Sequence, residues 1–273
     1  MNGNDALIKY RAELNVASIT LDAPQRRNAL STRMIGGLRD SLARAVADPA
    51  VRVVVIDHTG PVFCAGADLK ESAAATGLED LPAAHLAELL ADMCEAPKPV
   101  VVDARGGAKG GGLGLLAAAD IALVEEGSPM SFSEVRLGVV PAVIAPVVGH
   151  KIGPGLMRRL FLTGEPFDAP QAERWGLIAE AVAQGGSDER RAAVVASLTA
   201  GGPSAQAGIK RLTGAVDLRE QLRAAAALTA EYFFAEEGRE GVRSFIEKRP
   251  ASWVGLPAAD RPDRSHLCAL SWP

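Results

Sequence analysis

Residues 107–114 read GAKGGGLG, and five of these eight residues are glycine. The stretch lies between an apolar run and a segment that is typical of a helix. Glycine permits backbone angles that other residues resist, and it lets another group come close to the main chain. The stretch therefore predicts a tight loop at a helix start, with a backbone that something else approaches.

The glycine loop does not match the two common nucleotide-binding patterns. A Walker A loop needs Ser or Thr after its lysine, but Lys109 is followed by Gly110. A dinucleotide fingerprint needs glycines at i, i+2 and i+5. Starting at Gly110 or Gly112, the third glycine would fall on Leu115 or Ala117. Both nucleotide interpretations fail.

The composition sets broad limits on function. At 273 residues the chain can form one large domain or a domain with an appendage. Its 48% hydrophobic and 23% charged residues are typical of soluble globular enzymes. A net charge of −4 gives no general basic field, so nucleic acid is not an expected partner. No apolar run approaches the roughly 18 residues of a membrane span, and the N-terminus lacks the apolar stretch of a signal peptide.

Three cysteines, Cys64, Cys94 and Cys268, lie far apart and form no CxxC pair. This usage fits a reducing compartment without a disulfide framework. We therefore expect a cytoplasmic protein.

Short apolar, β-branched runs alternate with helical patterns in the first two thirds of the chain. The predicted buried strands are 18–22, 53–57, 100–103 and 121–124. The predicted helices are 31–47, 82–95 and 111–119. Ser31 is placed to cap the first helix. This alternation favours an α/β core over residues 1–186, whereas 187–273 looks helical and ends, after Trp253, in an irregular tail.

Other catalytic signatures are missing from the sequence. The four histidines are scattered without an HExxH pattern, and no GxSxG elbow occurs, so we expect neither a metal site nor a serine hydrolase. His150 is interpreted as a surface or structural residue. Cys64 has no histidine nearby in sequence, which favours a buried apolar role over a nucleophilic one.

Two small-residue loops, FCAGADLKE at 63–71 and GGAKGGGLG at 106–114, each follow a strand. Backbone N–H groups at a helix start form a site for negative charge, and two donors from separate loops can converge on one oxygen. Such an oxyanion hole suits a thioester carbonyl that becomes an enolate. The alternative is that these glycines only permit tight turns and close packing.

Five motifs stand in order along the chain: FCAGADLKE (63–71), GGAKGGGLGLLAAADIALV (106–124), SFSEVRLGVVP (131–141), LTGEPFDAPQAERWGLI (162–178) and FIEKRPASW (245–253). Together they resemble the crotonase (enoyl-CoA hydratase/isomerase) superfamily over nearly the whole chain. The resemblance implies an α/β spiral of repeated ββα units with an acyl-CoA site in 1–186. It also implies a helical region, 187–273, that builds homotrimers, often paired as hexamers.

The resemblance also implies a set of catalytic groups. The N–H groups of Ala67 and Gly111 would hold the thioester oxygen, and Gly110 would leave room for it. Glu134, in FSEVRLG, falls where the superfamily places a catalytic glutamate. No cofactor is expected, because the coenzyme A thioester is itself the substrate.

Further residues fall at positions that contact coenzyme A in the superfamily. Ala65 and Asp68 would flank the adenine and acyl pockets, and Lys70 would lie near the CoA. Arg26 matches a position near the CoA phosphates, and Lys248 one that often reaches a neighbouring subunit's CoA.

One position departs from the two-glutamate hydratases that the chain resembles. Their second carboxylate stands three residues after the oxyanion glycine, and here that residue is Gly114. Glu134 could then shuttle a proton between carbons, as in an isomerase, or serve both hydration roles through one water. Alternatively, Gly114 could make room for a bulkier or polar acyl group.

These observations predict an enoyl-CoA hydratase for a short- or branched-chain 2-enoyl-CoA. The alternatives are an enoyl-CoA isomerase using the same glutamate and a catalytically weak acyl-CoA-binding protein. The run RLGVVPAVIAP (136–146) is similar to a subgroup with some members that act on branched, dicarboxylic acyl-CoAs.

Overall fold

The computed structural model describes residues 7–254, and its main feature is a large sheet. The strands of this sheet stand in the order β1-β2-β3-β5-β7-β9, with β1 antiparallel to β2 and the other neighbours parallel. Their bounds are β1 Ile8–Glu13, β2 Val16–Leu21, β3 Val53–His58, β5 Val100–Ala104, β7 Ile121–Glu125 and β9 Glu180–Val182.

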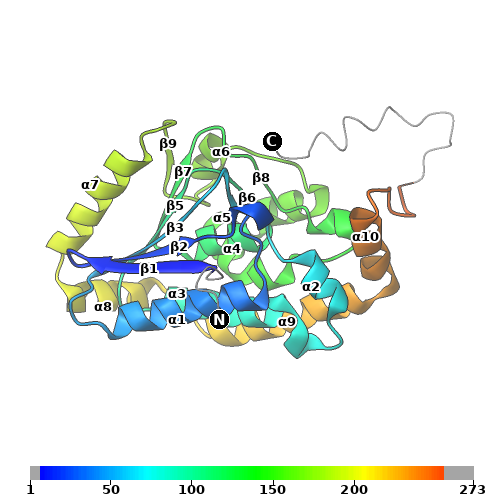
Figure 1. The fold of residues 1–273 in the computed structure, drawn as a ribbon, viewed down its shortest axis with the longest axis horizontal. Coiled ribbons are helices and arrows are strands. Elements are labelled where there is room, and N and C mark those ends of the chain that lie inside the picture. Colours follow the sequence, from blue (N-terminus) through cyan, green and yellow to red (C-terminus); the bar gives the residue numbers. More distant parts are fainter. Residues whose placement is uncertain (1–6, 255–273) are drawn as a thin grey trace.

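A second, smaller sheet produces the spiral. Its parallel strands are β4 Val62–Cys64, β6 Gly107–Lys109 and β8 Met130–Ser131. Each follows one strand of the large sheet, and each is followed by a helix. The main helix of each unit is α3 Pro82–Glu95, which follows β4 after the short helix α2 Leu69–Ala74, then α4 Gly111–Ala118 after β6 and α5 Ala145–Thr163 after β8. The repeated ββα unit expected from the sequence is therefore present (Figure 1).

The predicted strands and helices of the core correspond to β2, β3, β5, β7, α1, α3 and α4. Helix α1, Thr32–Ala47, begins as expected, because the Ser31 hydroxyl accepts a hydrogen bond from the Met34 N–H at 3.1 Å. Two shorter helices, α2 Leu69–Ala74 and α6 Ala169–Arg174, and four 3₁₀ turns complete the core. The turn η1 spans Pro24–Arg26, η2 Leu78–Asp80, η3 Glu134–Leu137 and η4 Ala142–Ile144.

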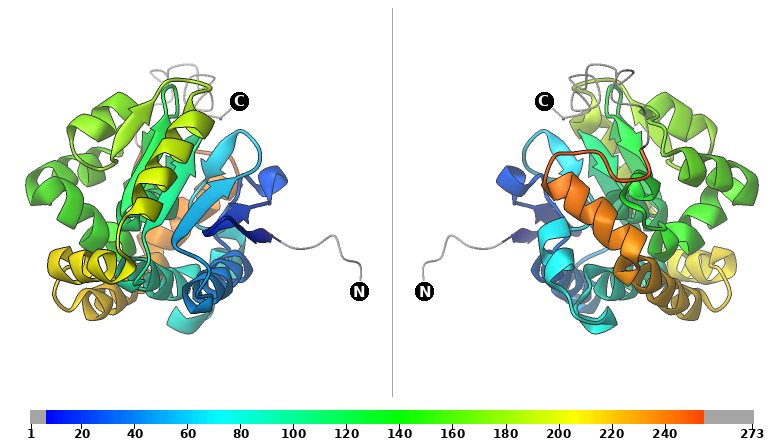
Figure 2. Two further views of the ribbon diagram at one scale, coloured as in Figure 1. Left: turned by 90° about the vertical axis from the view of Figure 1, so that its left-hand side faces the viewer. Right: turned by 90° about the vertical axis from the view of Figure 1, so that its right-hand side faces the viewer.

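The C-terminal region is helical within the described residues. Its helices are α7 Ser187–Ala200, α8 Pro203–Thr213, α9 Leu218–Phe234 and α10 Glu236–Ile246. Helix α7 covers the outer face of the large sheet, and α9 packs along α3 (Figures 1 and 2). Helix α10 lies against η3 and α2. The tail expected after Trp253 falls almost entirely outside the described residues.

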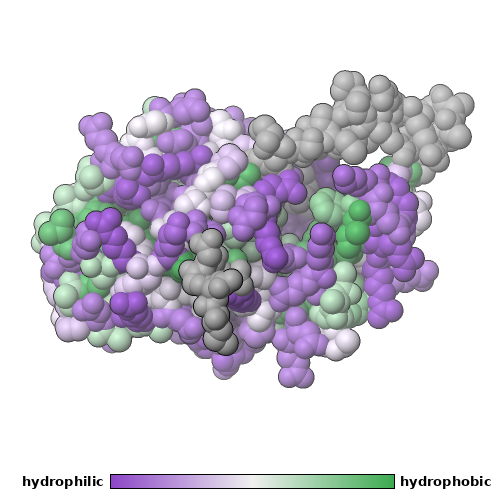
Figure 3. Space-filling view, viewed as in Figure 1, coloured by the Kyte–Doolittle hydropathy of each residue, from purple (hydrophilic) through white to green (hydrophobic). Residues whose placement is uncertain are grey.

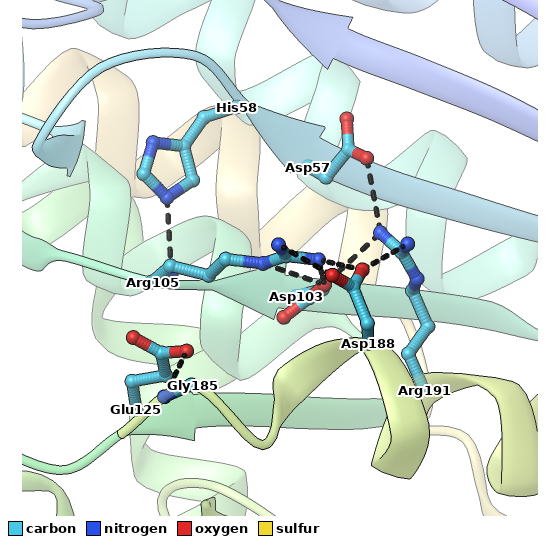
Figure 4. A network of polar contacts seen from close by, with 8 residues as sticks. All are labelled: Asp57, His58, Asp103, Arg105, Glu125, Gly185, Asp188 and Arg191. Carbon is cyan, nitrogen blue, oxygen red and sulfur yellow. Dashed lines mark hydrogen bonds and ion pairs between the residues drawn. The ribbon is translucent and has the colours of Figure 1, made fainter.

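A network of charged side chains joins α7 to the large sheet (Figure 4). Asp103, at the end of β5, is fully buried and contacts Arg105 at 3.0 Å and Arg191 at 3.1 Å. Both arginines also contact Asp188 on α7, and Arg191 reaches Asp57 on β3 at 3.2 Å. Since an unpaired buried carboxylate is costly, this network fixes α7 on the ends of β3 and β5.

Apolar side chains are not confined to the core. Tyr232, Phe245 and Ile246 on the C-terminal helices are exposed, and Figure 3 shows an apolar area beside α10 on a mostly polar face. Along residues 7–254, no helix combines the length and the apolar character that crossing a bilayer requires.

Candidate active site

The first candidate donor, the N–H of Ala67, is oriented by a parallel bridge with Leu30. Leu30 donates from its N–H to the Gly66 carbonyl at 2.8 Å and accepts from the Asp68 N–H at 3.2 Å. Because both neighbours of Ala67 bond to Leu30, the N–H of Ala67 points to the opposite side. Ala67 is exposed, and no group of the described residues accepts a hydrogen bond from its N–H.

The second candidate donor is the first N–H of helix α4. Gly110 caps this helix with φ of 48°, a left-handed value that favours glycine. The N–H of Gly111 has no hydrogen-bond acceptor within the part of the chain that the structure describes. A helix start carries a partial positive charge, so this N–H is suited to an oxyanion.

Packing brings the two donor loops together. The position that a Cβ would occupy on Gly66 lies 3.1 Å from the Lys109 carbonyl oxygen, just before Gly110. A Cβ on Gly111 would lie 2.9 Å from a methyl of Leu30, the residue paired with Ala67. The structure thus places the two predicted oxyanion loops side by side.

Glu134 lies directly against this arrangement. A Cβ on Gly110 would stand 2.7 Å from Oε1 of Glu134, so only glycine lets the carboxyl come this close to the loop. Burial raises the pKa of Glu134 from 4.5 to about 7, against a smaller lowering by its own backbone N–H. Its Oε2 is buried and has no hydrogen-bond partner among the described residues. A carboxyl with this pKa can both take and return a proton near neutral pH.

The turn that carries Glu134 is covered by α10. A Cβ on Gly138, at the end of η3, would be 2.7 Å from the Glu237 carbonyl oxygen. A Cβ on Gly241 would be 2.0 Å from the Leu137 carbonyl oxygen. Backbone therefore packs directly on backbone here, and the C-terminal helical region contributes to the position of Glu134.

The expectation that Gly114 makes room for an acyl group is wrong. Gly114 is buried in α4, and a Cβ there would lie 2.5 Å from Cγ2 of Ile144 and 3.4 Å from Leu90. Ile144, in η4, is fully buried. The volume beside Gly114 is therefore filled by a side chain of the protein, and it is available neither to substrate nor to a second carboxylate.

The predicted CoA contacts around α2 are on the same loop as Ala67. Asp68 caps α2, because its Oδ1 accepts from the N–H groups of Lys70 and Glu71 at 3.1 and 3.2 Å. Ala65 is half-buried and donates its N–H to a backbone carbonyl, and Lys70 is exposed. The structure gives Asp68 a helix-capping role, and the contacts of all three with CoA stay predictions.

Arg26 and Lys248 are both exposed. Arg26 ends η1, in the loop between β2 and α1, and Lys248 follows α10 with a left-handed φ of 54°. Their contacts with CoA phosphates and with a neighbouring subunit's CoA stay predictions.

Cys64 is fully buried, as predicted. Burial raises the pKa of its thiol to about 12, so it is not a thiolate at neutral pH. His150 is exposed, as expected for a surface histidine. Between residues 7 and 254, no group of three or more His, Cys, Asp or Glu side chains is arranged to hold a metal ion.

A spiral of ββα units with two backbone amides, unpaired within residues 7–254, beside a half-buried glutamate, whose Oε2 is buried, defines a crotonase-type protein, and sequence comparison agrees. The family profile described as Enoyl-CoA hydratase/isomerase matches residues 11–256, and the chain belongs to this family.

Solved structures and a curated relative are similar over most of the chain. An enoyl-CoA hydratase from Mycobacterium avium is 37% identical with a TM-score of 0.82, covering 92% of this chain and 100% of that one. An enoyl-CoA hydratase from Shewanella pealeana is 30% identical with a TM-score of 0.73, covering 92% and 97%. The Enoyl-CoA hydratase domain-containing protein 3, mitochondrial, of Danio rerio is 29% identical over 246 residues, covering 87% of this chain and 84% of the relative.

Proposed function

We propose that the protein is an enoyl-CoA hydratase for a short- or branched-chain 2-enoyl-CoA thioester. Its acid/base group is Glu134, and its oxyanion donors are the N–H groups of Ala67 and Gly111. The observation that supports this most is the Glu134 carboxyl, with its pKa raised to about 7, against the glycine loop that begins α4. The names of the similar hydratases support it further.

In this mechanism the thioester oxygen accepts hydrogen bonds from both amides. The Glu134 carboxylate takes a proton from water as the water oxygen bonds to the β-carbon, and the double-bond electrons move onto the thioester oxygen. The resulting enolate collapses as its α-carbon takes the proton from Glu134. Proton transfer of this kind contributes ~10²–10⁴-fold, and one oxyanion donor ~10²–10³-fold. The thioester is the substrate, and the steps use no other cofactor.

An enoyl-CoA isomerase is the second candidate, and the packing at Gly114 favours it. Because Ile144 fills the space beside Gly114, no second carboxylate can stand at that position, and the proposed acid/base chemistry falls to Glu134. One carboxyl is sufficient to remove a proton from the α-carbon of a 3-enoyl-CoA and return it to the γ-carbon. In this reaction no water is added.

A product assay separates the two candidates. We expect trans-2-butenoyl-CoA and a branched 2-enoyl-CoA to lose their enoyl absorbance and yield 3-hydroxyacyl-CoA. Formation of 2-enoyl-CoA from 3-hexenoyl-CoA, without any hydration, would establish the isomerase instead. Tight binding of these thioesters with no turnover would contradict both and would support an acyl-CoA-binding protein.

The oxyanion assignment has its own test at Gly111. Proline is tolerated at the first position of a helix, so Gly111→Pro removes the N–H without breaking α4. Gly111→Ala introduces the same Cβ contact with Leu30 and keeps the N–H. We expect kcat of the proline variant to fall ~10²-fold or more below that of the alanine variant. Equal activity in the two variants would contradict the role of this amide.

The oligomer and location are part of the same proposal. We propose a homotrimer, or a hexamer of paired trimers, in which the exposed Tyr232, Phe245 and Ile246 become buried. Light scattering of the purified protein gives the mass directly, and a monomer would contradict this. We also propose a cytoplasmic location, which fractionation of cells can check.

A further inference from the structure

We infer that Asn28 is a positioning residue of the oxyanion hole. It fixes the direction of the Ala67 N–H through residues 27–30, which pair with the loop that contains Ala67. This inference rests on the proposed role of Ala67. It assigns a function to a buried side chain in the loop between β2 and α1 whose hydrogen bonds go to Ala23, Thr59 and Val62 and to neither Ala67 nor Glu134.

Asn28 has 0% exposure, and its amide group is fully used. Its Oδ1 accepts from the Ala23 N–H at 2.8 Å. Its Nδ2 donates to the Thr59 carbonyl at 3.0 Å and to the Val62 carbonyl at 2.9 Å. One side chain thus ties the end of the β2 segment to the turn before β4 and to the first residue of β4. No other residue type of this size offers two donors and an acceptor in that geometry.

The backbone on both sides of Asn28 bonds to the donor loop. The Arg27 carbonyl accepts from the Ala65 N–H at 3.0 Å, and Leu30 makes the two hydrogen bonds that flank Ala67. Residues 27–30 and 65–68 therefore run as a paired strip, and Asn28 fixes the start of that strip against β4. A shift of Asn28 would rotate the strip and turn the Ala67 N–H away from the thioester oxygen.

The backbone of Asn28 is in the left-handed region, with φ of 50°. Asparagine, aspartate and glycine tolerate this conformation better than other residues do. Asn28→Gly therefore removes the side chain without backbone strain, and Asn28→Asp keeps the size but loses both Nδ2 donors. Ser31→Ala is the matched control, because it removes a helix-capping bond in the same segment and leaves the strip intact.

The direct readout is the infrared band of the thioester carbonyl in bound butyryl-CoA, labelled with ¹³C at that carbon. Hydrogen bonds from an oxyanion hole polarise this carbonyl and move its band to lower wavenumber. We expect a clear shift in the wild type and in Ser31→Ala, and a smaller one in Asn28→Gly and Asn28→Asp. No shift in the wild type would contradict the proposed oxyanion hole. A full shift in the Asn28 variants would overturn the positioning role of Asn28 alone.

Kinetics supply a second, independent measurement. We expect kcat of both Asn28 variants to fall ~10-fold or more, approaching the loss of one oxyanion donor, with the Kd of butyryl-CoA changed less than ~3-fold. A parallel loss of kcat and binding, or a loss no larger than in Ser31→Ala at equal thermal stability, would mean that Asn28 only stabilises the fold. If Asn28→Gly does not fold, Asn28→Asp carries the same test.

Discussion

Replacing Glu134 with glutamine should cost activity and add stability, because the site buries a carboxyl that prefers to be ionised. Glutamine has the same shape but cannot transfer the proton, so we expect kcat to fall ~10²-fold or more. The gain in stability is less obvious, and it follows from the pKa. Burial raises the pKa of Glu134 from 4.5 to about 7, which means that the fold disfavours its charged form.

The sign and size follow from linkage. A carboxyl whose pKa is higher in the native state than in the unfolded state costs no stability at pH values below the unfolded-state pKa. It lowers the stability of the fold as the pH rises from there through the native-state pKa. The full shift, from 4.5 to about 7, corresponds to about 3 kcal/mol. At about pH 5 only about 1 kcal/mol of this penalty acts, and at about pH 8 nearly all of it does. Glutamine never ionises and escapes the penalty.

Urea denaturation of wild type and Glu134→Gln at the two pH values measures this difference. We expect the variant to gain about 2 kcal/mol relative to the wild type between about pH 5 and about pH 8. Both proteins are compared at one concentration, because assembly would make stability concentration-dependent. A stability difference that does not change with pH would refute the raised pKa, and unchanged kcat would refute the catalytic role.

Three further predictions concern other parts of the molecule. Gly114→Glu alone should destabilise the protein by about 3 kcal/mol or more and should not increase the rate of enoyl-CoA hydration, because Ile144 fills the space. Adding Ile144→Ala should make room for the carboxylate and raise that rate at least ~10-fold. A double variant that hydrates no faster than Ile144→Ala alone would contradict this. Asp103→Asn should lower the unfolding free energy by about 3–5 kcal/mol, whereas Glu13→Gln, in an exposed pair, should change it little; equal losses by urea denaturation would disprove the buried network. Burial lowers the pKa of His58 below 6.5, so the fold favours its neutral form. Relative to His58→Gln, the wild type should lose stability as pH falls below about 6.5. Unfolding free energies that depend on pH identically in the two proteins would refute this.

The sequence was sufficient for the elements with a long, regular apolar pattern. Strands such as β3 and β5 are β-branched runs, and α1 has both an apolar face and a serine cap. Strands β4, β6 and β8 have only two or three residues, too few for any periodicity to emerge. Helix α5 was not predicted, because Gly153 has a non-helical backbone and Pro154 follows it inside the helix.

The candidate site was only partly visible for a similar reason. The small-residue loops indicated bare backbone amides, and the resemblance to the crotonase superfamily indicated Glu134, because glycine loops and short motifs are local features. The filling of the space beside Gly114 by Ile144 is a tertiary contact, and no local pattern announces it. The role of Asn28 has no local signal either, because two of its three hydrogen bonds reach Thr59 and Val62, in a distant part of the sequence.

The packing of α10 on the Glu134 turn has a consequence for biosynthesis. The strands and loops with Ala67, Gly111 and Glu134 leave the ribosome before α10 does, and chains begin to fold from their N-terminal part. The Leu137 carbonyl meets Gly241 only once that helix has emerged. A nascent chain can therefore contain every proposed catalytic residue before Glu134 has a fixed position. We expect such a chain to become active only after α10 has been synthesised and has packed against η3.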